Sequence, residues 1–237
     1  MISEMIVAEI IYTESQKELG IIVAQKMVSI ISKTIDEYGK CFFAVSGGRT
    51  PLPVYGILKN KNYQQILDWS KVHVFFTDER CVSKDDRENN FISCYDSWLQ
   101  FFPSINSYQI EGWLNPGEAA LKYENIIKSV LNKQNGFPQF DLIFMGIGDD
   151  GHVASLFPEY DFEKNINNYV EGYHVNKVNM NRVTMTLPLL NNAKNRLFGI
   201  IGKKKKTILN DLLNYKYKNY PIARLLSSEA NDTWVVN

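Results

Sequence analysis

The residues with the clearest capacity for chemistry lie between Met145 and Pro158, in the stretch MGIGDDGHVASLFP. Three glycines there fit the pattern G-x-G-x-x-G after the apolar run FDLIF: Gly146, Gly148 and Gly151. This pattern also opens dinucleotide-binding turns, although alone it is a weak indication. A dinucleotide site needs a crossover helix of about a dozen residues, and Pro158 interrupts any helix that begins near Ala154. Asp149 and Asp150 would also repel a pyrophosphate, so a dinucleotide site is disfavoured.

His152 is the better candidate for chemistry in this stretch. An imidazole has an ordinary pKa of about 6.5, so a histidine can accept and return a proton near neutral pH. Asp150 lies two residues earlier and could orient the ring and stabilise its charged form. The alternatives are an aspartate that caps a helix and a histidine that only supports the structure. A metal site is not expected, because the chain has three histidines and no H-E-x-x-H spacing.

The composition restricts the classes of partner. Lysine plus arginine and aspartate plus glutamate number 26 each among 237 residues, so nucleic acid is not expected as the main partner. The three cysteines form no C-x-x-C pair, which favours free thiols in a reducing compartment. The first residues lack a basic segment and no run of 18 apolar residues occurs, so we expect neither a signal peptide nor a membrane span. These observations predict a cytoplasmic protein.

Strand-like and helix-like segments alternate along the chain. Short apolar or β-branched runs predict strands at residues 6–12, 41–45, 72–77, 140–145, 182–187, 196–202 and 232–236. Helix-like segments lie between them, at residues 14–38, 51–60, 91–102, 118–132 and 204–214. This alternation predicts an α/β fold with a mostly parallel central sheet flanked by helices. The polar segment 164–181 is interpreted as a surface excursion, and a single domain is expected over residues 1–237.

In open α/β sheets, ligands bind beyond the carboxyl ends of the strands. Four predicted strands are followed there by polar residues, in the segments SGGRTP (46–51), TDER (77–80), MGIGDDGH (145–152) and GKKKKT (202–207). In SGGRTP, Gly47 and Gly48 permit backbone amides to approach a ligand closely, and Ser46 and Thr50 add hydroxyl groups. An ordinary tight turn before a helix accounts for the same residues equally well.

Two of these junctions carry positive charge. Arg80 in TDER could grip a phosphate with its fork of donors, or pair with the neighbouring acids at the surface. The lysines of GKKKKT lie at a predicted helix start, where they oppose the helix dipole unless an anion binds there. The helical phase lets only one or two of them point toward a shared site. A solvated basic face or a localisation signal is the alternative.

Together with RVTMTLPLLN, these segments resemble the 6-phosphogluconolactonase family in order and spacing, from about residue 10 to the end of the chain. The run GIGDDGHVASLFP is the most specific part of the likeness. The resemblance implies a Rossmann-like α/β sandwich and a cytoplasmic esterase of the pentose phosphate pathway that needs no metal or cofactor. Its substrate would be 6-phospho-D-glucono-1,5-lactone. The expected partner is therefore this small phosphosugar lactone, and we expect a monomer.

The resemblance also implies roles for individual residues. His152 would be the general base, Asp150 would orient it, and Asp78 would occupy an acidic position in the same cleft. The phosphate-facing loop would contain Ser46, Gly47, Gly48 and Thr50. The basic side chains at the site would be Arg80, Arg182 and Lys205. Lys205 is chosen over its neighbours by the spacing G-x-x-K from Gly202, and Arg49 departs from the small hydroxyl residue of many relatives.

Two alternatives to a lactonase follow from the same residues. A glucosamine-6-phosphate deaminase or isomerase would carry a catalytic glutamate in an IAFNEP-like run after the histidine. Here VASLFP places Phe157 at that position, and Arg80 replaces the tyrosine expected of the deaminases. A non-catalytic sugar-phosphate sensor is the other alternative. It would need neither His152 nor Asp150.

Overall fold

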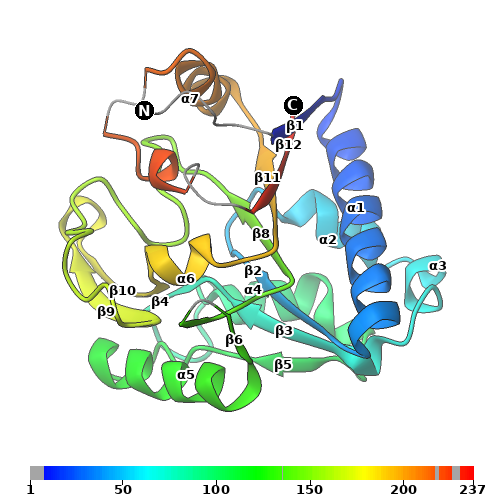
Figure 1. Ribbon diagram of the computed structural model, residues 1–237, viewed down its shortest axis with the longest axis horizontal. Coiled ribbons are helices and arrows are strands. Elements are labelled where there is room, and N and C mark those ends of the chain that lie inside the picture. Colours follow the sequence, from blue (N-terminus) through cyan, green and yellow to red (C-terminus); the bar gives the residue numbers. More distant parts are fainter. Residues whose placement is uncertain (1–7, 135, 217–218, 226–229) are drawn as a thin grey trace.

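The computed structural model describes residues 8–134, 136–216, 219–225 and 230–237. At its centre lies a seven-stranded sheet in which every neighbouring pair of strands is parallel. In spatial order the strands are β1 (Ala8–Tyr12), β12 (Asn231–Val236), β11 (Asn195–Ile200), β8 (Leu142–Gly146), β2 (Cys41–Val45), β3 (Val72–Phe76) and β5 (Asn106–Tyr108). Helices flank this sheet (Figure 1), so the predicted α/β fold is confirmed.

The connections between the parallel strands contain the helices, as parallel order requires. The α-helices are α1 (Gln16–Tyr38), α2 (Leu52–Leu58), α3 (Lys61–Gln64), α4 (Asn90–Ser97), α5 (Pro116–Val130), α6 (Leu187–Asn191) and α7 (Lys203–Leu213). Short 3-10 helices are η1 (Trp69–Lys71), η2 (Leu99–Phe101), η3 (Asn176–Val178) and η4 (Pro221–Arg224). Within the described ranges, no helix has both the length and the apolar character that a membrane crossing requires.

Helix α1 shows how the sequence sets its own boundaries. The Ser15 side chain accepts a hydrogen bond from the backbone N–H of Glu18 and caps the first turn. Gly39 ends the helix at a φ of 80°, and its N–H donates to the carbonyl of Ile35. The apolar side chains between these caps recur at helical spacing and are buried: Leu19, Val23, Met27 and Ile31. This face packs on β2, β8, β11 and β12, so α1 covers one side of the sheet.

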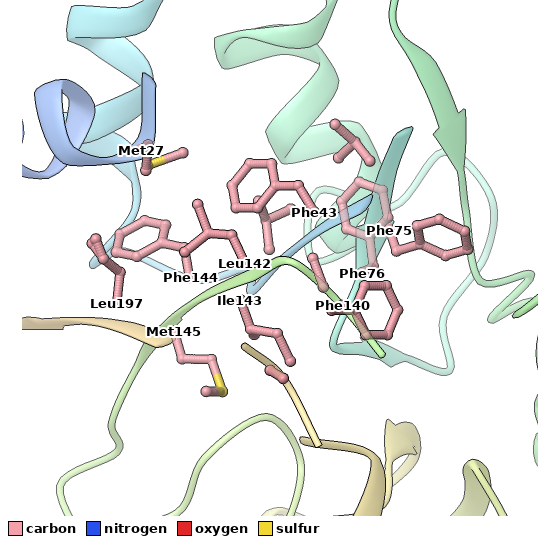
Figure 2. Close-up of a cluster of buried hydrophobic side chains, with 14 of the residues drawn as sticks. Met27, Phe43, Phe75, Phe76, Phe140, Leu142, Ile143, Phe144, Met145 and Leu197 are labelled. Carbon is pink, nitrogen blue, oxygen red and sulfur yellow. The ribbon is translucent and has the colours of Figure 1, made fainter. Parts of the chain in front are cut away.

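The hydrophobic core lies on both faces of the central strands. Figure 2 shows Leu142 and Phe144 of β8 on the same side as Met27 of α1, while Ile143 and Met145 point to the opposite face. All four of these β8 side chains are fully buried. Strand side chains alternate between faces, so a continuous apolar run is what a strand covered on both sides requires. The buried side chains therefore fix where β8 ends and where the loop after it begins.

A second, antiparallel sheet stands beside the first. It consists of β4 (Asp78–Arg80), β10 (Met180–Met185) and β9 (Val170–Val175), in that order. The chain enters β4 only one residue, Thr77, after β3 ends. In Figure 1 the hairpin of β9 and β10 lies on the side of the molecule away from α1. A separate short ribbon is formed by β6 (Lys133–Gln134) and β7 (Phe137–Pro138).

This second sheet corrects two interpretations of the sequence. The TDER segment was interpreted as the polar residues that follow a strand, but residues 78–80 form a strand of their own, β4, and pair with β10. The polar segment 164–181 was expected to be a surface excursion, but it contains β9, the turn η3 and the start of β10. Burial does not alternate from one residue to the next along β9, so the segment lacks the period-two pattern that indicates a strand.

Three smaller expectations also differ from the structure. Strand β5 was not predicted, since its sequence NSY is polar and it lies at the edge of the sheet. The helix expected over residues 91–102 stops at Ser97 and is followed by η2. No helix begins at Ala154, whose left-handed φ of 48° is incompatible with a helical turn. The residues after the glycines form turns instead.

A buried ion pair joins β11 to β12 and gives a test of stability remote from the loops. Arg196 lies opposite Asp232, with Nε 2.7 Å from Oδ1 and Nη2 2.9 Å from Oδ2, and its side chain is fully buried. Replacing Asp232 by Asn leaves a buried guanidinium without its counter-charge. Asp232→Asn should therefore lower the free energy of unfolding by about 3–5 kcal/mol in urea denaturation.

The control variant is Lys26→Met, which breaks the exposed ion pair between Lys26 and Glu9. Exposed pairs contribute about 0–1 kcal/mol, so this variant should unfold nearly as the wild type does. Equal losses for both variants would show that burial does not control the cost.

Candidate active site

A cavity of about 260 Å³ opens where β2 and β8 end, beside the second sheet. Every predicted site residue except Asp150 lines it: Ser46, Gly47, Gly48, Thr50, Asp78, Arg80, His152, Arg182 and Lys205. Asp150 lies outside the lining but is hydrogen-bonded to His152. The remaining lining residues are Arg49, Asn90, Gly146, Ile147, Gly148, Asp149, Ala154, Ser155 and Phe157. The junctions that follow separate strands in the sequence therefore meet at one place.

The loop of residues 46–50 packs against the carboxyl ends of the central strands. Thr50 lies against the strand glycines Gly146 and Gly199, where an added Cβ would come within 3.1 Å and 2.9 Å of its side chain. Gly48 has a φ of 85°, a backbone conformation that side chains disfavour. Among the described residues, the backbone N–H groups of residues 47–50 have no hydrogen-bond acceptor. They are available to an anion.

Asn90 is a lining residue that the sequence did not indicate. It is the first residue of α4 and is 2% exposed. Its Nδ2 donates to the backbone carbonyl of Asp78 at 2.9 Å, and its Oδ1 has no hydrogen-bond partner among the described residues. A Cβ on Gly47 would lie only 1.8 Å from that Oδ1. Gly47 is thus required by its contact with Asn90, and no local pattern connects these two positions.

Lys205 is the lysine of the GKKKKT run that reaches the cavity. Its Nζ lies 3.3 Å from Oγ1 of Thr50. Burial lowers the pKa of Lys205, while the nearby Asp149 acts in the opposite direction. Lys204 does not line the cavity: its side chain is 77% exposed and its Nζ lies 3.7 Å from Oδ2 of Asp149. The helical phase of α7 therefore separates the two lysines.

Two arginines lie side by side on neighbouring strands of the second sheet. Arg80 and Arg182 are directly opposed in the β4–β10 register. Arg182 is 9% exposed, and its Nε and Nη1 are buried without a partner among the described residues. Burial lowers the pKa of Arg182, and the charge of Arg80 lowers it further. Like charges opposed on neighbouring strands are destabilising, so an anion bound between them would be strongly favoured.

The carboxylate of Asp78 connects the second sheet to the loop after β8. Its Oδ2 accepts a hydrogen bond from Ser155 Oγ at 2.7 Å, and its Oδ1 accepts from Thr77 Oγ1 at 3.0 Å. Thr77 Oγ1 is also 2.8 Å from Ser46 Oγ. The neighbouring Glu79 caps α4 instead, accepting the backbone N–H groups of Asn90 and Phe91. Ser155 was not among the predicted site residues, although it follows the histidine closely in the sequence.

The loop after β8 folds so that His152 returns toward the strand. Gly148 donates its N–H to the carbonyl of His152 at 2.8 Å, and Gly151 adopts a φ of 81° in the intervening turn. The imidazole lies so close to Gly148 that a Cβ there would be 2.1 Å from the ring. On its other side, the ring stacks on Phe157 with centroids 4.2 Å apart and planes at 23°. The glycine spacing therefore makes room for a histidine ring.

Asp150 determines which nitrogen of His152 is free. Its Oδ1 lies 2.6 Å from Nδ1 of the ring and 3.2 Å from the backbone nitrogen of His152. Burial alone would raise the pKa of Asp150, but hydrogen bonds from His152 and from Lys177 outweigh it and hold the pKa well below its usual range. The ionised carboxylate can only accept, so Nδ1 must carry a proton. In the neutral form of the ring, Nε2 then keeps its lone pair and can accept a proton.

The described residues contain no group of three or more His, Cys, Asp or Glu side chains arranged to hold a metal ion. The cavity instead gathers cationic side chains and an imidazole. These groups suit an anionic ligand and a proton transfer.

The contact between Gly148 and His152 gives a direct test of this geometry. Gly148→Ala should displace the imidazole and break its hydrogen bond to Asp150, because the added Cβ overlaps the ring. Imidazole ¹H–¹⁵N NMR spectra should show the loss of the protected Nδ1–H proton. Gly56→Ala is the control, since a Cβ there meets no atom within 4 Å. A wild-type His152 spectrum in Gly148→Ala would contradict the described position of the ring.

Three comparisons place the chain among known proteins. Residues 14–234 match the family model described as glucosamine-6-phosphate isomerases/6-phosphogluconolactonase. A 6-phosphogluconolactonase from Synechocystis sp. is 34% identical over 213 residues, covering 87% of this chain and 86% of the relative. The 6-phosphogluconolactonase from Thermotoga maritima is 34% identical over 218 residues, covering 90% of this chain and 92% of the relative.

Comparison with a solved structure indicates the same family as the sequence comparisons. The crystal structure of 6-phosphogluconolactonase from Thermotoga maritima superposes with a TM-score of 0.82 at 31% identity, over 97% of this chain and 99% of the other. The cavity described above lies within the matched region. The chain therefore belongs to the glucosamine-6-phosphate isomerase/6-phosphogluconolactonase family, and within it to the 6-phosphogluconolactonases.

Proposed function

We propose that this protein hydrolyses 6-phospho-D-glucono-1,5-lactone to 6-phospho-D-gluconate, with His152 as the general base. The observation that carries the proposal is the 2.6 Å hydrogen bond between Asp150 and His152 in the wall of a cation-lined cavity. Relatives that bear the name 6-phosphogluconolactonase over most of the chain support it. A lactone is a cyclic ester, so its hydrolysis needs an activated water and a place for the developing negative charge.

In the proposed reaction, Nε2 of His152 takes a proton from water as the water oxygen attacks C1 of the lactone. The tetrahedral oxyanion that forms needs hydrogen-bond donors near C1, which backbone N–H groups can supply. The C1–O bond to the ring oxygen then breaks, and His152 returns its proton to that oxygen. Asp150 stabilises the imidazolium between these steps, because its low pKa keeps it ionised.

We assign phosphate recognition to the cationic side chains and the glycine loop together. The residues concerned are Ser46, Gly47, Gly48, Thr50, Arg80, Arg182 and Lys205. The phosphate is remote from C1, so its binding energy serves to hold C1 at the base. Asp78 acts through its contacts with Ser155 and Thr77, which fix the two loops on either side of the cavity.

The surroundings of His152 argue against the deaminase alternative. A deaminase of this family would place a glutamate where this chain has Phe157, and the Phe157 ring stacks on the imidazole. An apolar ring at that place cannot exchange a proton with an amino sugar. The sensor alternative leaves the ordered pair of Asp150 and His152 without a purpose. A site that only binds a phosphosugar has no need of a free Nε2 held by an ionised carboxylate.

Direct assay separates these activities. The lactone is generated in place by a glucose-6-phosphate dehydrogenase, and its loss is followed against the spontaneous hydrolysis. Acceleration that is proportional to protein concentration supports the lactonase. Ammonia release from glucosamine 6-phosphate at a comparable rate would replace it with the deaminase, and binding of 6-phosphogluconate without turnover would favour the sensor.

Replacing the base should separate turnover from binding. His152→Ala should lower kcat by roughly 10²- to 10⁴-fold with little change in KM, since the phosphate contacts lie elsewhere. In the wild type, kcat should fall toward acid pH because only the neutral imidazole accepts a proton. His174→Ala is the control, because His174 is exposed on β9 and outside the cavity lining. A folded His152→Ala protein with wild-type kcat would end this mechanism.

The two neighbouring lysines of α7 test the phosphate assignment. Lys205→Met should raise KM on the order of 10- to 100-fold, because a half-buried cation that meets the phosphate is lost. Lys204→Met removes the same charge from the same helix, but from an exposed position paired with Asp149. Its KM should stay within about twofold of the wild type. Equal increases in KM would assign the effect to general charge instead of to Lys205.

A further inference from the structure

The tip of the β9–β10 hairpin touches the loop that carries His152. This tip is η3, and its Lys177 donates a hydrogen bond from Nζ to Oδ2 of Asp150. Oδ1 of the same carboxylate is bonded to Nδ1 of His152. The two oxygens of Asp150 are thus divided between the imidazole and a lysine from a distant part of the chain. Neither Lys177 nor Asp150 lines the cavity, so their contact lies outside the surface that a ligand would touch.

A second contact holds the hairpin tip in place. Oε1 of Glu159 accepts the backbone N–H groups of Asn176 at 2.6 Å and Lys177 at 3.4 Å. Glu159 follows Phe157 closely, in the same loop as His152. Farther along β9, the Tyr173 hydroxyl donates to the backbone carbonyl of Ser155. The hairpin is therefore fastened to this loop through these contacts, and one of them involves the carboxylate that orients the base.

We propose that Lys177 is a positioning residue for the reaction. It fixes the Asp150 carboxylate so that Oδ1 points at Nδ1 of His152. Its positive charge also offsets part of the negative charge that Asp150 presents to the imidazole. This inference rests on the proposed function in so far as it concerns turnover. The position of Lys177 relative to Asp150 and His152 does not depend on the substrate. Lys177 touches no reacting atom, so it acts only through Asp150.

The direction of the electrostatic effect follows from the signs of the charges. An aspartate beside an imidazole favours its charged form, and a lysine that shares the same carboxylate weakens that effect. Removing Lys177 should therefore make His152 easier to protonate. The acid limb of the kcat profile should then move to higher pH, since kcat requires the neutral imidazole.

Other charged groups surround the same cavity, and they are unchanged in a Lys177 variant. The loop after β8 contributes Asp149, which also lies near the exposed Lys204, and α7 contributes Lys205. The second sheet contributes Asp78, Arg80 and Arg182. The loop after β2 contributes Arg49. A shift seen on replacing Lys177 alone is therefore attributable to its contact with Asp150.

An exposed ion pair usually contributes little to stability, and Lys177 is half exposed. Asp150 differs from an ordinary surface partner because its side chain is only 17% exposed and is also bonded to the ring. The consequence of losing Lys177 should thus be seen at His152 and in turnover, while the urea midpoint of unfolding changes little. That separation distinguishes positioning from a structural role.

The decisive variants are Lys177→Met, Lys177→Arg and the control Lys164→Met. Lys164 is an exposed lysine of the same segment of the chain. In Lys177→Met, kcat should fall by about threefold to thirtyfold at neutral pH with KM unchanged, and the acid limb should move up by about half a unit to one unit. Lys177→Arg should restore most of both, because arginine keeps the charge and the donor. Lys164→Met should match the wild type.

Imidazole NMR tests the inference without any substrate. The chain has three histidines, and the His152 signals are those lost in His152→Asn. The titration midpoint of His152 should rise in Lys177→Met and not in Lys164→Met. Equal midpoints in all three proteins, or a change in KM alone, would overturn the role of Lys177. Absence of lactone turnover in the wild type, together with the expected NMR shift, would refute the proposed function and leave the positioning contact standing.

Discussion

Three walls of the cavity meet at the buried carboxylate of Asp78. Its two oxygens accept hydrogen bonds from Ser155, in the loop that carries His152, and from Thr77, which also contacts Ser46 of the glycine loop. Its backbone carbonyl holds Asn90, whose side chain presses on Gly47. A buried carboxylate must have its acceptors satisfied, so these contacts are mutually dependent. The positions of His152 and of the loop of residues 46–50 relative to each other therefore depend on the hydrogen bonds of Asp78.

The cavity also concentrates features that an unliganded protein would avoid. Arg182 keeps two buried donors that meet no acceptor in the described part of the chain, and Arg80 stands directly opposite it. The Asn90 side-chain oxygen has no donor among the residues that the structure describes, and Ala154 adopts a left-handed backbone conformation. Each of these features costs free energy of folding. Their collection in one cavity is the signature of a site whose contacts are completed by a ligand.

The sequence predicted the parts of this structure that depend on short-range patterns. Residues 41–45 were expected as a strand and form β2, and the rule on carboxyl ends brought Ser46 and His152 to one cavity. The sequence did not predict the contacts between residues that lie far apart along the chain. Asn90 meets Gly47, and Lys177 meets Asp150, through pairings of β4 and β9 with β10 that leave no periodic trace in polar segments. Edge strand β5 was missed for the same reason.

The order of strands in the central sheet has a consequence for synthesis on the ribosome. β12 lies between β1 and β11, so β1 hydrogen-bonds to a strand more than 200 residues later in the chain. Until residues 231–236 have emerged, β1 has no neighbour and β11 exposes an open, apolar edge. Such long-range pairing forms slowly, and the folding intermediates expose apolar surface that promotes aggregation. The nascent chain therefore holds an unfinished sheet until β12 inserts between β1 and β11, so residues 231–236 supply the pairing that joins β1 to the rest of the sheet.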